Sequence, residues 1–557
     1  MTNDRPADLI LSGATVHAGV GAGTDASPGP ADHVAISAGR ISAVGTATEA
    51  RAHAGPNTEV LDVRGAMVVP GFQDAHVHPP HGGLAELRCE LHELLDADAY
   101  LAAVAGYAAA NPSATWILGG GWAMPAFPSG TPRREALDDI VPDRPVFLVN
   151  RDGHGAWVNS RALELAGIDA GTPDPSDGRI ERDAVGAPTG TLHEGAMDLV
   201  GRLAPPATQT DMERALLLAQ RRLHAFGVTA WQDAWVTPPD LEAYRALAGR
   251  GELTARVVAA LWWDRHRGLE QVDDLVAQRE RGMVGRLRAT SVKIMQDGVC
   301  ENFTAAVLDP YLDGDGRATE NRGISFVDPE LLEEAVTRLD ALEFQVHFHA
   351  LADRAVREAL DAVEAARRAN GLTDTRPHLA HLQVVHPDDL SRFRSLGAVA
   401  NVQPLWAAHE TQMDELTIPF LGEPRWRWQY PFASLVRNGA MLAMGSDWSV
   451  SSPNPLEEIH VAVNRVMPPS YPYGANRDEV FLPEERLDLE TSIAAFTIGS
   501  AFVNHLDRET GSVEVGKLAD LAVIDRNVFA HPSEEIAEAR CQMTFVEGER
   551  VFAAADA

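Results

Sequence analysis

The chain has 557 residues, more than the roughly 250–300 at which a single hydrophobic core stops growing, so one large domain with smaller satellites is expected. Lys and Arg number 47 against 80 Asp and Glu, which gives a formal net charge of −33. This acidic balance argues against nucleic acid or an anionic membrane as a partner, and it leaves a small-molecule substrate open.

The cysteines and the N-terminus predict a cytoplasmic protein. Cys89, Cys300 and Cys541 show no CxxC spacing, which is typical of a reducing compartment rather than a disulfide framework. The opening segment MTNDRPADLI lacks a basic region followed by a long apolar stretch, so no signal peptide is expected. The sequence contains no run of about 18 apolar residues, so no membrane span is expected. A homo-oligomer is left open.

The two ends of the chain share a β-like pattern. Short strands separated by Gly and Pro are predicted near the N-terminus at Ala7–Val16, His33–Ile41 and Thr58–Asp62. Similar strands are predicted near the C-terminus at Ala519–Ile524 and Met543–Val551. Chain termini often lie close together, so residues 1–70 and 505–557 are predicted to form one composite β domain, a small sandwich.

The middle of the chain alternates apolar strand-like segments with helix-like segments. Eight strands are predicted at Ala66–Ala75, Val228–Ala234, Arg256–Trp263, Ser291–Gly298, Phe344–Ala350, Leu379–Val385, Ala398–Pro404 and Met441–Trp448. Helices are predicted at Asp328–Leu342, Asp353–Asn370 and Asp388–Leu396, each opening near an acidic residue. This α/β alternation favours a (β/α)8 TIM barrel over residues 71–504. Strand counting alone leaves a doubly wound open sheet as the alternative.

A long gap separates the first two predicted barrel strands. Residues 84–205 far exceed an ordinary crossover, and they include a Gly/Pro/Asp-rich loop at 171–178. We expect this stretch to be an inserted subdomain over the barrel mouth.

The segment GFQDAHVHP, which ends the first barrel strand, carries two histidines. His76 and His78 point to the same side of a strand because side chains alternate. At the C-terminal end of a barrel strand that side faces the site, where two imidazoles can chelate a divalent metal. The alternative is a pair of surface histidines in a turn.

Other predicted strand ends carry further groups able to bind a metal or support one. They are Lys293 in the fourth strand, His347 and His349 in the fifth, His381 in the sixth and Asp447 in the eighth. A lysine inside an apolar strand is unusual because charged side chains are seldom buried unpaired. The joint pattern predicts a metal site.

This ordered set resembles the amidohydrolase superfamily, and the wider pattern is similar to its YtcJ-like branch. The motifs that carry the resemblance span essentially the whole chain: PGFQDAHVHP, GGGW, DGHGAWVNS, SVKIMQDG, HFHALADRAV, HLQVV, NVQP, GSDW with NPLEEI, and GSVEVGKLADLAVID. The resemblance implies one or two Zn²⁺ ions held by His76, His78, Lys293, His349, His381 and Asp447. It also implies that CO2 carboxylates Lys293 to a bridging carbamate, that His347 supports the ligands or is the next candidate ligand, and that Asp353 is structural.

Substrate contacts are expected from residues in the branch motifs, namely Trp122, His154, Gln403 and Trp448. Together with Trp262 and Trp263 they suggest an apolar portion of the substrate, although packing is the commoner role of a tryptophan. Two departures from the branch, Ala352 and the segment Cys300–Ala305, put a substrate borrowed from relatives in doubt.

The chemistry that this site implies is metal-assisted hydrolysis of a C–N amide-type bond, in an N-substituted formamide or a small N-acyl amide. Zn²⁺ would lower the pKa of a water to about 7, and Asp447 would act as general base and then general acid. The alternatives are a cyclic amide, carbamate or ester hydrolase, a lyase or isomerase on the same site, and a non-catalytic regulatory or binding protein. The complete ligand set argues against the last.

Overall fold

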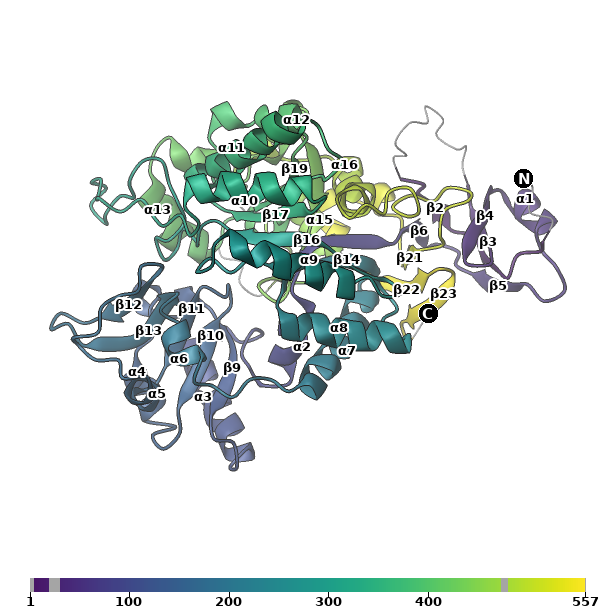
Figure 1. Cartoon of the computed structure of the whole chain (residues 1–557). Helices are drawn as coiled ribbons and strands as arrows, with labels where there is room; N and C mark the ends of the chain where they lie inside the picture. Colours follow the sequence, from purple (N-terminus) through teal and green to yellow (C-terminus); the bar gives the residue numbers. More distant parts are fainter. Residues whose placement is uncertain (1–4, 20–30, 472–478, 556–557) are drawn as a thin grey trace.

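An eight-stranded parallel sheet lies at the centre of the computed structural model, which describes residues 5–19, 31–471 and 479–555 (Figure 1). In spatial order its strands are β7 (Phe72–Val77), β14 (Val228–Val236), β15 (Arg256–Trp262), β16 (Leu287–Met295), β17 (Gln345–Ala350), β18 (His378–His381), β19 (Val399–Val402) and β20 (Met441–Met444). The first and last strands meet where the Asp447 N–H donates to the His76 carbonyl at 2.7 Å. The predicted TIM barrel is confirmed.

Helices cover the outside of this barrel (Figure 1). The main ones are α7 (Gln209–Ala225), α8 (Pro238–Arg250), α9 (Val272–Arg281), α10 (Pro329–Ala341), α11 (Asp353–Asn370), α12 (Arg392–Leu396), α14 (Phe432–Arg437) and α15 (Pro455–Asn464). The α11 helix is amphipathic, because apolar residues at helical spacing, among them Val356, Leu360 and Val363, are buried while its four arginines are not. The helix expected at Asp388–Leu396 is instead a 3-10 turn, Pro387–Asp389, followed by α12.

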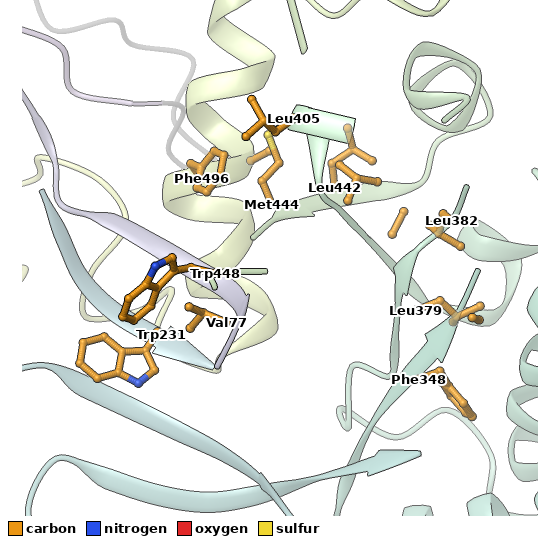
Figure 2. Close-up of a cluster of buried hydrophobic side chains, with 14 of the residues drawn as sticks. Val77, Trp231, Phe348, Leu379, Leu382, Leu405, Leu442, Met444, Trp448 and Phe496 are labelled. Carbon is orange, nitrogen blue, oxygen red and sulfur yellow. The ribbon is translucent and has the colours of Figure 1, made fainter. Parts of the chain in front are cut away.

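Apolar side chains on the outer face of the barrel strands form the main core with these helices. Figure 2 shows Trp231, Phe348, Leu379 and Leu442 in this layer. The described helices include none that is both long enough and apolar enough to cross a bilayer.

The inside of the barrel below the site is polar and hydrogen-bonded. Gln232 donates from Nε2 to Gln345 Oε1 at 2.9 Å, and its Oε1 lies 2.7 Å from His347 Nδ1 and 2.9 Å from His378 Nε2. All four side chains are buried, and their polar atoms are satisfied by one another and by neighbouring groups such as Asn504 and Asn401.

Strands from both chain ends pair in one sheet. Its order is β2 (Thr15–Val16), β6 (Met67–Pro70), β21 (Leu521–Ile524), β22 (Cys541–Val546) and β23 (Glu549–Ala553). A second sheet holds β4 (Arg40–Gly45), β3 (His33–Ser37), β1 (Leu9–Ser12) and β5 (Glu59–Asp62). The two sheets share one apolar core, and Figure 1 shows the yellow C-terminal strands beside the purple N-terminal ones. Residues 1–4, where no signal peptide was expected, lie outside the described ranges.

The predicted strand Ala66–Ala75 is in fact two strands in two sheets. The chain leaves the composite sheet after β6 and enters the barrel as β7, with Gly71 between them. A side chain at Gly71 would meet the Thr229 side chain at 2.4 Å, so only glycine allows this close crossing. An apolar run does not reveal where a chain changes sheets.

The long segment between β7 and β14 folds on a six-stranded sheet of its own. The sheet order is β12 (Gly178–Arg182), β13 (Pro188–Glu194), β11 (Gly155–Val158), β10 (Val146–Asn150), β9 (Ile117–Trp122) and β8 (Cys89–Glu90). Helix α3 (Ala97–Ala110) packs on it in one apolar cluster, and helix α5 (Ser160–Ala166) packs on it in a second. In Figure 1 this unit is the blue region beside the barrel.

Replacing Leu521 by alanine tests whether the two chain ends fold as one unit. Leu521 is fully buried in the core shared by both ends, so the change should cost about 2–5 kcal/mol of stability. Limited proteolysis should then cleave the N-terminal and C-terminal segments together. Val60→Ala, at a position 57% exposed in the same region, is the control and should leave the cleavage pattern unchanged. Cleavage confined to the C-terminal segment would contradict a shared core.

Candidate metal centre

Six of the residues singled out in the sequence lie at one end of the barrel. His76 is on β7 and His78 follows it, Lys293 is on β16, His349 is on β17, His381 ends β18, and Asp447 follows β20. All of these strands are parallel, so their C-terminal ends open on one face of the barrel, which is where the sites of such barrels are built.

Three of these side chains converge closely on a carboxylate. Asp447 Oδ1 lies 2.8 Å from His78 Nε2 and 3.2 Å from His76 Nε2. Ligand atoms of His76, His381 and Asp447 all lie within 4.8 Å of one another, and all three residues are buried. The His349 ring follows, with its centroid 4.3 Å from that of His381. The structure thus brings at least four of the expected ligands into one cluster.

Several buried nitrogens of this cluster have no hydrogen-bond partner among the described residues. They are Lys293 Nζ, His78 Nδ1 and both ring nitrogens of His381. An unpaired buried polar atom costs about 1–3 kcal/mol, so such a concentration needs a bound group to compensate it. Imidazole nitrogen and carboxylate oxygen are the donors that Zn²⁺ and related ions take. The residues present therefore fit a divalent metal.

Protonation in the cluster is compatible with metal binding. Burial, together with neighbouring cationic groups, lowers the pKa values of His76, His349 and His381 well below the usual value, so these rings are neutral at pH 7. Neutral imidazole is the form that binds a metal. Burial also lowers the pKa of Lys293 to about 7, although Asp447 and Asp233 favour its charged form.

His347 lies one layer below the ligand cluster. Its Nε2 is 2.8 Å from His76 Nδ1, and its Nδ1 is 2.7 Å from Gln232 Oε1. Both ring nitrogens are therefore committed, which gives His347 a supporting role and fixes the orientation of His76.

Asp297 supports His349 in the same way, and the sequence interpretation gave it no role. Its Oδ1 lies 3.1 Å from His349 Nδ1, and its carboxylate also accepts backbone N–H groups from Ala306, Leu351 and Ala352 at 2.9–3.0 Å. Burial raises the pKa of Asp297 to about 7. The sequence signal that could have identified Asp297 was its place in SVKIMQDG, two residues beyond the end of β16.

Asp353 was expected to be structural. Its carboxylate accepts from the Leu308 N–H at 2.9 Å, which is a structural contact.

The loop that carries Asp447 is held against β7. Asp447 has a φ of 55°, a region that non-glycine residues rarely adopt, and its N–H donates to the His76 carbonyl. The Asp74 carboxylate accepts from the Ser446 N–H at 3.0 Å and from the Ser446 hydroxyl at 2.5 Å. Asp447 thus has little freedom to move away from His76 and His78.

A largely buried ion pair from the insertion reaches the same end of the barrel. His154 lies with its ring centroid 5.4 Å from that of His349, and its Nδ1 is 2.9 Å from Glu194 Oε1. Glu194 also accepts from Thr304 Oγ1 at 2.8 Å and from Asn302 Nδ2 at 3.2 Å. Burial acts against the charges, yet Glu194 raises the pKa of His154 to about 9, and His154 lowers that of Glu194 to about 2. Sequence reasoning missed Glu194, because its partners come from distant segments.

The other expected substrate contacts have different surroundings. Trp122 is fully buried in the insertion, where its indole N–H donates to the Leu148 carbonyl at 2.9 Å, so it packs. Gln403 is fully buried, and its Oε1 accepts from the His381 N–H at 2.9 Å, so it positions His381. Trp448, which is 5% exposed, lines a cavity of about 220 Å³ beside the site.

Comparisons with known proteins agree with this architecture. Residues 59–552 match the model of the amidohydrolase family. Protein LONG AFTER FAR-RED 3 of Arabidopsis thaliana is 31% identical, over 98% of this chain and 92% of that protein. N-substituted formamide deformylase of Arthrobacter pascens is 29% identical, over 97% of each chain. The crystal structure of an uncharacterized metal-dependent hydrolase from Pyrococcus furiosus is 26% identical, covers 93% of this chain and 99% of its own, and superposes with a TM-score of 0.70.

Replacing Glu194 by glutamine should remove the ion pair with His154. The raised pKa of His154 means that the pair stabilises the fold fully below the usual histidine pKa of about 6.5, and that this contribution is lost as the pH rises through about 9. The variant should lose about 1.5–3 kcal/mol, the range for hydrogen bonds to charged groups.

The measurement is the thermal denaturation midpoint of both proteins at about pH 6 and about pH 10. The difference between the proteins should be larger at the lower pH. A difference that does not change with pH would contradict a charged His154–Glu194 pair. Glu549→Gln, on an exposed carboxylate of β23, is the control.

Proposed function

Because this chain belongs to the amidohydrolase family, we propose that it is a metal-dependent hydrolase that cleaves a C–N amide-type bond. The observation that carries the proposal is the set of unpaired buried nitrogens of Lys293, His78 and His381 around Asp447. A hydrolase of this kind needs such donors, whereas a purely structural core does not tolerate them.

The proposed ligands are His76, His78, Lys293, His349, His381 and Asp447, with Zn²⁺ as the metal. When bound, Zn²⁺ polarises a carbonyl and lowers the pKa of a water to about 7. One ion needs only the histidines and Asp447. Two ions need a bridge, which carboxylated Lys293 would supply with its two oxygens.

The chain's own residues provide positioning and proton transfer. We assign to Asp447 the removal of a proton from the attacking water and its delivery to the leaving nitrogen. His76 Nε2 and His78 Nε2 lie 3.2 Å and 2.8 Å from Asp447 Oδ1, close enough for one ion to be bound by all three, and the contact between Ser446 and Asp74 holds the loop of Asp447. His154, fixed by Glu194 beside His349, is placed to contact the substrate.

We propose an N-substituted formamide or a small N-acyl amide with an apolar portion as the substrate. Support comes from the likeness to N-substituted formamide deformylase, which extends over nearly the whole of both chains. Cyclic amides, carbamates and esters are the alternatives on the same site. The three free cysteines support a reducing compartment, and we infer a cytoplasmic enzyme without a nucleic-acid partner.

A hydrolysis screen combined with metal analysis tests this function. The purified chain is loaded with Zn²⁺, its metal content is measured, and product release is followed for N-formyl amines, N-acyl amines, cyclic amides, carbamates and esters. We expect turnover of the N-formyl or N-acyl compounds that disappears on chelation. Turnover confined to another bond class would replace the proposed substrate, and no metal uptake would refute the metal-dependent mechanism.

Asp447→Asn should retain metal yet lose most hydrolysis, because an amide cannot carry the proton. The expected loss in kcat is at least about 10²–10⁴-fold, the usual contribution of acid–base catalysis. Turnover and bound metal are measured on the same sample. Asp138→Asn in the insertion, whose carboxylate accepts from Ser160, is the control for a carboxylate-to-amide change away from the site. Near-normal turnover of the Asp447 variant with full metal content would remove Asp447 from the mechanism.

Lys293→Ala should lower metal content and activity together if Lys293 carries a bridging carbamate. A short carboxylic acid such as acetate or propionate should then restore part of both, because its carboxylate replaces the missing carbamate oxygens. Metal per chain is measured with and without the acid. A full metal complement in the alanine variant would instead indicate a one-metal enzyme with Lys293 in a supporting role.

A further inference from the structure

Two tryptophans lie at the C-terminal ends of neighbouring barrel strands, beside the candidate metal centre. Trp235 is near the end of β14 and Trp262 ends β15. Their ring centroids are 5.2 Å apart and their planes are inclined by 34°. We call this pair the tryptophan shelf.

The shelf keeps accessible apolar surface, unlike Trp231 of β14 and Trp263, which directly follows β15. Trp235 is 38% exposed and Trp262 is partly exposed, whereas Trp231 and Trp263 are almost completely buried in the helix-facing core. Large aromatic side chains stabilise a fold most when they are buried. An accessible aromatic pair beside candidate ligands is therefore available to a ligand.

The shelf is continuous with the candidate ligands. The Trp235 ring is edge-on to His78, with centroids 6.4 Å apart, and edge-on to His81 at 4.5 Å. Trp262 pairs in register with Lys293 on β16. Paired residues of neighbouring strands project to the same side of a sheet, so Trp262 shares the barrel-mouth side with Lys293.

We propose that the tryptophan shelf binds a planar aromatic substituent on the nitrogen of the substrate. This inference rests on the proposed function. In a formamide or a small N-acyl amide the acyl side is small, so a large substituent must be on the nitrogen. Stacked and edge-to-face aromatic contacts add attraction beyond the area that they bury, which a saturated ring of the same size does not gain. The shelf therefore selects aromatic over saturated substituents.

The test compares two formamides that differ only in their ring, N-(2-phenylethyl)formamide and N-(2-cyclohexylethyl)formamide. The Zn²⁺-loaded full chain is assayed as wild type, Trp235→Leu and Trp235→Phe. We expect wild type to prefer the phenyl compound in kcat/KM, and Trp235→Leu to reduce that preference about 3- to 10-fold, chiefly through KM. Trp235→Phe should retain most of it, since it keeps an aromatic face.

Controls separate the shelf from general damage and from another use of the surface. Phe529→Ala removes an aromatic side chain that is 42% exposed in a distant segment, and it should leave the preference unchanged. Metal content should be equal in all variants. An unchanged preference in Trp235→Leu would overturn the proposal, and so would a change in oligomeric state without a change in KM, which would make the shelf a subunit contact.

Binding distinguishes failure of the shelf from failure of the proposed function. Each formamide is titrated into the Zn²⁺-loaded protein while tryptophan fluorescence is followed. If wild type hydrolyses neither compound, the formamide part of the proposed function fails, yet tighter binding of the phenyl compound that depends on Trp235 still supports the shelf. Equal binding of the two compounds, or equal binding by wild type and Trp235→Leu, overturns it.

Discussion

Much of the barrel depends on one constraint, the desolvation free energy of the buried polar groups at its mouth. These groups are neutral imidazoles, a lysine and a carboxylate. Lys293, His76 and His381 are at most 3% exposed, so bulk solvent reaches little of their polar surface. The surrounding residues reduce the cost by fixing each ring through its second nitrogen or its backbone. Gln232 holds His347, Asp297 holds His349, and Gln403 binds the N–H of His381. The polar atoms that remain without a partner belong to the residues of the ligand cluster, among them Lys293 and His381.

The insertion belongs to this arrangement as well as to its own sheet. Glu194 is the last residue of β13, and its carboxylate contacts His154, Thr304 and Asn302. One side chain therefore connects the insertion to the loop that follows β16. A buried ion pair is weak support for stability by itself, because desolvation offsets much of the attraction. Its position beside His349 gives it a better explanation as part of the site.

Hydrophobic periodicity and composition predicted the strands and helices that depend on local sequence pattern. They did not predict the roles of residues that depend on contacts with distant segments. All eight barrel strands overlap predicted strand segments, although the first was predicted as one run with β6, and α11 has the bounds that were expected for it. The ligand candidates could be predicted because strand ends of a parallel barrel meet at one face. Asp297 and Glu194 could not, since the histidines that they contact, His349 and His154, lie 52 and 40 residues away in the chain. Trp122 was expected to contact the substrate but is buried in the insertion. A sequence motif does not show which face of a sheet is covered by other elements.

The candidate ligands also lie where the barrel closes. In the described chain, β7 forms its strand pairing with β14, interrupted by two register shifts, and it meets β20 through single contacts around the site. These contacts run from the Asp447 N–H to the His76 carbonyl, from Ser446 to Asp74, and from the His78 N–H to the Trp448 carbonyl at 2.9 Å. The segments that supply His76, His78 and Asp447 are thus the segments that join the first strand to the last. An ion bound by all three would bridge this junction, so metal affinity and closure of the barrel share the same free energy.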